Sequence, residues 1–98
     1  MEHTLNLQIK KFGDFLTSRP AGREAALSCL AYDPAVKNTT SICLDFSGVV
    51  VMTPSWLGEF IQTLQSKGIV DIQFLPSTNP TVISSIEFIE PEIKSTNG

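Results

Sequence analysis

A buried strand that passes through a short polar loop into an amphipathic helix is the feature that most constrains this chain. Residues 41–46, Ser-Ile-Cys-Leu-Asp-Phe, form a nearly continuous apolar run, which is typical of a central strand covered on both faces. Pro54 stands at the first position of the following helix, with Thr53 as its cap. The apolar residues of this helix share one face, namely Leu57, Phe60, Ile61 and Leu64. The unit predicts an α/β fold, in which loops after strands carry function.

The part of the chain before this unit predicts a strand, a brief second strand after a turn, and a helix. Residues 5–10 alternate apolar and polar side chains, as a strand with one buried face does. A turn signal within residues 13–16 predicts a hairpin or a short bend followed by a brief strand. Residues 19–32 form the helix, with Gly22 as a weak point that costs roughly 1 kcal/mol relative to Ala. Residues 35–40 read as a polar surface loop.

The part after this unit predicts a third strand over residues 71–75. Residues 81–89 predict a last short helix, although their β-branched content makes a strand the alternative. From Pro91 onward we expect a frayed, disordered tail. Residues 1–98 therefore predict a single domain with its core over roughly residues 5–90, in which helices pack on a sheet with parallel pairs.

Composition argues against several classes of protein. The net charge is −3, and the densest basic spot is the pair at residues 10–11, so we expect no nucleic-acid partner. The longest uninterrupted apolar run, residues 49–52, is too short to span a membrane, and the polar start offers no signal peptide. We therefore expect a cytoplasmic protein that does not bind membranes. Cys29 and Cys43 read as small buried apolar residues rather than as a disulfide framework.

Three places hold side chains that could carry chemistry. The hydroxyl of Ser55 lies at a helix N-terminus, where it either carries a phosphate or only helps to cap the helix. Asp45, at a strand end, is either a metal ligand or base, or a carboxylate that accepts bonds from loop amides. Ser18 and Arg19 form either an anion-binding pair or a helix cap beside a surface cation.

Two residues of the central helix are open to two interpretations. Trp56 is either a lid on the core or an exposed binding anchor, and Glu59 is either a partner contact or a solvated acid near the helix dipole. The only histidine, His3, stands in the N-terminal segment. The sequence has no Gly-rich phosphate loop, CxxC, HExxH or nucleophile elbow, so we expect no enzyme, cofactor or metal.

Residues 44–49 and 52–58 together resemble the STAS pattern of anti-sigma factor antagonists, in which Asp-Leu-Ser-Gly-Val precedes Asp-Ser-Ser-Gly-Leu-Gly. The chain is also similar to the STAS-like family of unknown function, DUF4325. That pattern has a Ser-Arg pair opening the first helix, then Asp-Phe-x-Gly-Val, then a hydroxyl-rich loop before a helix that carries an acid. The matching segments are Ser18-Arg19, Asp45 to Val49, and Thr53 to Ser55 with Glu59.

The resemblance implies a two-layer sandwich with a mixed sheet of about four strands, two main helices and a short C-terminal helix. It implies a non-catalytic regulatory module of bacterial cytoplasm that docks a histidine-kinase-like ATPase or another signalling protein through residues 53–67. The implied partner contacts are Thr53, Ser55, Trp56 and Glu59, and Ser55 stands at the position of the phosphoacceptor. Trp56 replaces the glycine that follows that serine. The oligomeric state we expect is a monomer or a weak homodimer.

A second function belongs to another class. Arg19, Ser18 and the loop hydroxyls could hold an anion at the helix N-termini, which would make the chain a sensor of a small ligand or a nucleotide.

Overall fold

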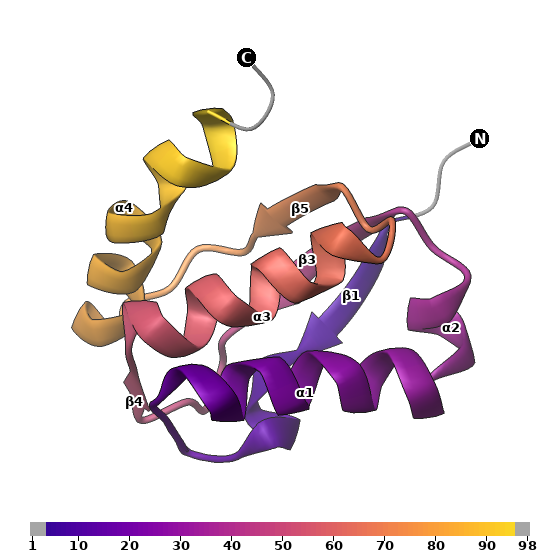
Figure 1. Ribbon diagram of the computed structural model, residues 1–98. Helices are drawn as coiled ribbons and strands as arrows, with labels where there is room; N and C mark the ends of the chain where they lie inside the picture. The colour runs from indigo at the N-terminus through magenta and orange to yellow at the C-terminus, as the bar shows by residue number, and fades with distance from the viewer. Residues whose placement is uncertain (1–3, 96–98) are drawn as a thin grey trace.

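Strands and helices alternate along the chain, as the sequence predicts for an α/β fold (Figure 1). The computed structural model describes the backbone of residues 4–95 and the side chains of residues 4–91. His3 and the last residues of the predicted disordered tail, 96–98, lie outside this part. The elements are β1 (Leu5–Gln8), the 3-10 helix η1 (Ile9–Phe12), β2 (Phe15–Leu16), α1 (Arg19–Tyr32), α2 (Pro34–Lys37), β3 (Ser41–Asp45), β4 (Val51–Met52), α3 (Pro54–Ser66), β5 (Asp71–Phe74) and α4 (Pro80–Ser95).

The strands form two small sheets in which every pairing is parallel. The larger sheet has the order β1-β3-β5, and the smaller one pairs β2 with β4. The structure thus differs from the expected single mixed sheet of about four strands. Of the two predicted alternatives for residues 13–16, the short bend followed by a brief strand is the one found, because η1 and Gly13, at φ 129°, carry the chain away from β1 before β2 begins.

The larger sheet has one apolar face and one polar face. Its register aligns Leu5, Ile42 and Ile72, and in the next row Leu7, Leu44 and Phe74; these residues belong to the core or pack against it. In Figure 1, α1 and α3 run across the sheet together. The opposite face presents exposed Asn6 and Gln73 beside Cys43, which is outside the core cluster. Cys43 itself is buried, so the prediction that β3 is a central strand covered on both faces is confirmed for residues 41–44.

The crossing of α1 and α3 depends on Gly22. This glycine is buried, and a Cβ atom placed on it would meet the backbone carbonyl oxygen of Trp56. The residue that looks like a weak point of the helix therefore lets two helix backbones touch. Trp56 itself is only 1% exposed and stacks on Phe60 at 4.9 Å between ring centroids. Of the two interpretations of Trp56, the structure supports the lid on the core.

Two segments are more helical than the sequence predicts. The expected surface loop after α1 contains α2, because Val36 is completely buried there and pins one turn to the core. The last helix is not short: α4 continues to Ser95, past the exposed Pro91 where we expected fraying. Val82, Ser85 and Ile89 are buried, and α4 packs on α3 and β4. This burial outweighs the β-branched content that favoured a strand.

Candidate functional site

The N-termini of α1 and α3 lie at the same edge of the molecule. Because β2 and β4 are parallel neighbours, their carboxyl ends meet, and each strand leads into one of these helices. Thr53 connects the two ends. Its amide donates to the Leu16 carbonyl at 3.1 Å, and its hydroxyl accepts from the Trp56 amide at 3.3 Å. Thr53 is thus the helix cap predicted from the sequence, and its hydroxyl faces its own helix rather than a partner.

The cap of α1 is conformationally strained. Ser18 accepts a hydrogen bond from the Ala21 amide at 3.3 Å, as a cap does. Its φ of 76° makes it the only non-glycine residue with positive φ among residues 4–95. Such a backbone costs of order 1–3 kcal/mol and is concentrated at functional sites. The strain falls next to Arg19, the predicted anion-binding residue.

A cleft of about 220 Å³ lies beside these two helix starts and brings three predicted site residues together. Arg19 comes from the first turn of α1, while Ser55 and Glu59 come from successive turns of α3. Within the described part of the chain, Arg19 and Glu59 form no ion pair within 4.0 Å. The charges therefore remain available to a ligand. The full lining is Arg19, Pro54, Ser55, Gly58, Glu59, Gln62, Phe88 and Ile89.

An aromatic side chain that the sequence analysis missed lines this cleft. Phe88 of α4 is 69% exposed, whereas the indole of Trp56 points into the core. The expected partner contact through the Trp56 side chain is therefore wrong, since this side chain is buried against Phe12 and Phe60. A signal for Phe88 existed in the sequence. Val82 and Ile89 lie on the face of α4 that is buried, and the helical periodicity places Phe88 on a different face. A large apolar residue on an exposed face is a signal for a binding surface.

Asp45 does not belong to the cleft. Its carboxylate accepts hydrogen bonds from the Ser47 amide at 3.0 Å and from the Ser47 hydroxyl at 2.7 Å. These bonds lower the pKa of Asp45 below its ordinary value of 3.8. The carboxylate thus closes the turn after β3, which is the simpler of its two interpretations. Among the described residues no group of three or more potential metal ligands comes together.

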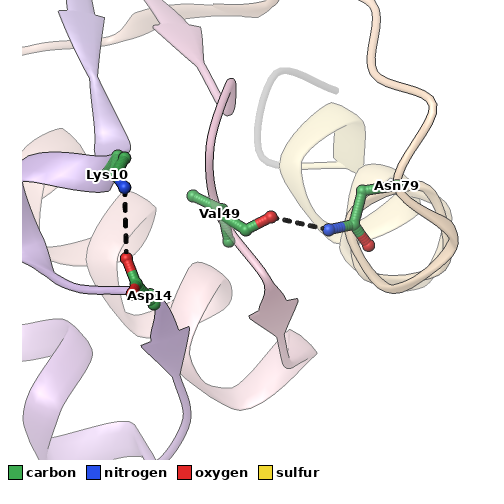
Figure 2. Close-up of polar contacts among 4 residues, drawn as sticks. All are labelled: Lys10, Asp14, Val49 and Asn79. Carbon is green, nitrogen blue, oxygen red and sulfur yellow. Dashed lines mark hydrogen bonds and ion pairs between the residues drawn. The ribbon is translucent and has the colours of Figure 1, made fainter.

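The free edge of β4 is closed by polar side chains from the start of α4, which we call the α4 latch (Asn79, Thr81 and Ser85). Asn79 donates to the carbonyl of Val49 at 2.8 Å, as Figure 2 shows, and to that of Val50 at 3.0 Å. Thr81 Oγ1 accepts from the Met52 amide at 3.0 Å, and Ser85 donates to the Met52 carbonyl at 3.3 Å. The α4 latch takes the place of a third strand and fixes α4, with Phe88, beside the cleft.

On the other side of the same loop, Lys10 and Asp14 form an exposed ion pair at 3.5 Å (Figure 2). The amides of Val50 and Val51 both donate to the Asp14 carbonyl, at 2.9 and 3.0 Å. The segment that leads into β4 is therefore bonded on both sides, by the bend after η1 and by the α4 latch.

Comparison with protein-family models, with curated proteins and with solved structures finds no match to this chain. In the part of the chain that the structure describes, no helix has the length and apolar character required to cross a bilayer.

Proposed function

We propose that the chain is a non-catalytic regulatory module that docks onto a histidine-kinase-like ATPase, in the manner of the anti-sigma factor antagonists that its sequence resembles. The docking surface consists of the loop and helix at residues 53–67, and a STAS-like two-layer arrangement and a cytoplasmic location are part of the proposal. The observation that carries it is the cleft, where Arg19, Ser55, Glu59 and Phe88 share one surface.

The distribution of burial along α3 supports this surface. The side that carries Trp56, Phe60 and Leu64 is buried, while Ser55 and Gln62 are exposed. Exposed polar residues beside an accessible aromatic ring are typical of protein interfaces, in which an aromatic anchor supplies much of the affinity. Phe88 therefore takes the role of exposed anchor, which was one of the two interpretations of Trp56.

The position of Ser55 supports a phosphoserine switch. Its exposed side chain lies in the first turn of α3, where free amides and the helix dipole favour negative charge. Arg19 lines the same cleft and adds a positive charge that suits a phosphate. A phosphate would add about −1.5 to −2 charges at pH 7 in the middle of the docking surface. Modification would therefore change the affinity for the ATPase.

The test is binding to purified histidine-kinase-like ATPases from the same genome, measured by titration calorimetry. We expect Phe88→Ala to weaken the complex by about 1–3 kcal/mol, and Ser55→Asp to weaken it as well. Tyr32→Ala is the matched control, because Tyr32 is an 84% exposed aromatic at the opposite end of α1. Unchanged binding by the Phe88→Ala and Ser55→Asp proteins would rule out this surface.

The second function is a sensor of small anions or nucleotides, and one observation favours it. Arg19 and Ser55 come from two different helix starts and line one cleft, next to the strained backbone of Ser18. A panel of nucleotides and phosphates in a thermal shift assay tests it. One kcal/mol of binding energy shifts the midpoint by about 4–8 °C in a domain of this size. The shift should disappear in Arg19→Gln, and a flat panel counts against the sensor.

A further inference from the structure

A second recessed surface lies on another part of the molecule, between β5 and α4. The groove has a volume of about 620 Å³ and is separate from the residues of the cleft. One wall is the continuous run of residues 70–77, which contains β5, and the other is one side of α4. Figure 1 shows the segment after β5 leading to α4, which is inclined away from the strand. The α4 side contributes Ile83, Ile86, Glu87 and Glu90.

The β5 wall is an open sheet edge. β5 pairs with β3 on one side, and no strand of the described chain pairs on the other. The amides of Asp71 and Leu75 donate to the carbonyls of Thr40 and Leu44, on the β3 side. Because successive backbone groups of a strand alternate in direction, the amides and carbonyls of Ile72 and Phe74 point to the open side. The groove is therefore bordered by a row of backbone donors and acceptors.

The groove is lined by apolar side chains and by charged side chains that are all negative. Val70 is 65% exposed and Ile83 is 39% exposed, so apolar surface lies at the strand and at the helix. Asp71, Glu87 and Glu90 line it, and its lining contains no lysine, arginine or histidine. The Asp71 carboxylate accepts a hydrogen bond from the Ser41 hydroxyl at 3.0 Å, so Glu87 and Glu90 of α4 are the carboxylates that can select a ligand. Of the side chains that protect open edges, β5, Asp-Ile-Gln-Phe, carries one charge, at Asp71, and no lysine or proline.

We propose that this groove binds an extended, basic segment of a partner protein, which adds to the larger sheet as a strand next to β5. Backbone pairing with Ile72 and Phe74 gives affinity, and the carboxylates select lysine or arginine at alternate positions. A second copy of the chain is disfavoured, because pairing two β5 strands would bring together two grooves of the same negative charge. This site is independent of the cleft, so it stands or falls separately from the proposed function.

The probe is a fluorescein-labelled peptide of alternating lysine and valine, about seven residues long, which is a common strand length. We expect saturable binding in fluorescence anisotropy that weakens as salt rises. The same peptide with glutamate in place of lysine should not bind. A version N-methylated at every backbone amide keeps its charge but can donate no ladder hydrogen bond, so it should also fail. Equal binding by the N-methylated peptide, or no binding by the parent peptide, would overturn the proposal.

Two further measurements locate the peptide. Glu87→Gln should weaken binding roughly threefold, as expected for one exposed charge pair, while Glu24→Gln on the exposed surface of α1 should leave it unchanged. Bound peptide should slow hydrogen exchange at the amides of Ile72 and Phe74. Unchanged exchange at these amides in a saturated complex contradicts strand addition. If the chain dimerises without peptide and the dimer slows exchange at these amides, a second copy of the chain fills the groove, and the proposal is overturned too.

Discussion

The short strands β4 and β5 each pair with one other strand, and their free edges differ in what covers them. Side chains of the α4 latch close the edge of β4, and the cleft lies beside this edge. We call the α4 latch and the cleft together the sealed side, and the groove between β5 and α4 the open side. The edge of β5 stays open and faces a groove lined by carboxylates. In the functions proposed above, the sealed side recognises a partner through side chains, and the open side recognises the backbone of a partner segment. The difference predicts that substitutions which break the α4 latch or the close crossing of α1 and α3 cost stability, whereas substitutions of exposed residues on the open side do not.

The largest expected effect is that of Gly22→Ala, which disturbs the close crossing of α1 and α3 that holds the two sides of the cleft together. An added Cβ would meet the Trp56 carbonyl, a backbone atom that cannot rotate away. We expect a loss of about 3 kcal/mol in the free energy of unfolding, measured with urea. Gly58→Ala is the matched control in α3, because its Cβ would lie 3.6 Å from Ile89, an ordinary contact. Helix propensity should make that variant neutral or up to about 1 kcal/mol more stable. Equal effects of the two substitutions would contradict the close crossing.

The second effect is that of Asn79→Ala, which opens the α4 latch. Besides bonding two carbonyls before β4, Asn79 accepts from the amide of Thr81 at 2.9 Å and so caps α4. Loss of the cap and of these bonds should cost about 2 kcal/mol in urea unfolding. The control is Asn38→Ala, because Asn38 is exposed and donates only to the nearby Pro34 carbonyl. If Asn79→Ala cost no more than the control, the α4 latch would not seal this edge.

On the open side, Glu87→Lys should leave the free energy of unfolding within about 0.5 kcal/mol of the unaltered protein. Glu87 is exposed, and its charge serves an external ligand in the interpretation given above. The measurement is the same urea titration. A loss comparable to that of Asn79→Ala would mean that the groove is part of the folding core, and the comparison between the two edges would fail.

The smallest effect is expected at Asp45, the last residue of β3, where hydrogen bonds from Ser47 lower the pKa of the carboxyl group below 3.8. A carboxylate whose pKa is lower in the folded state stabilises the fold above its unfolded pKa, and that stability is lost as pH falls through the folded value. Below about pH 4 the unaltered protein should therefore lose slightly more stability than Asp45→Asn. In an NMR titration, Ser47→Ala should raise the pKa of Asp45. A pKa that does not move in this variant would contradict the role of the hydroxyl.

Local features were predictable from the sequence because their causes are local. The bounds of α1, and the cap and first residue of α3, follow from the chemistry of serine, threonine and proline at helix starts. The residues Arg19, Ser55 and Glu59 were each identified, and the structure adds that they line one cleft.

Features that depend on distant contacts were not predictable. β2 pairs with β4 across more than thirty residues, and Asn79 binds carbonyls that are also far away in sequence. The burial of Trp56 depends on how closely α1 crosses α3, which is decided by Gly22 on the other helix. For this reason the sequence leaves Trp56 open between a lid on the core and an exposed anchor, and only the structure shows that Phe88 is the exposed aromatic residue.

The central claim is that the histidine-kinase-like ATPase docks at the sealed side of the molecule. NMR shift mapping of the isotopically labelled chain with the purified ATPase tests it most directly. We expect chemical-shift changes centred on the resonances of Ser55, Glu59 and Phe88, with those of Ile72 and Phe74 unchanged. Perturbations confined to residues 70–77, with the cleft unchanged, would contradict it.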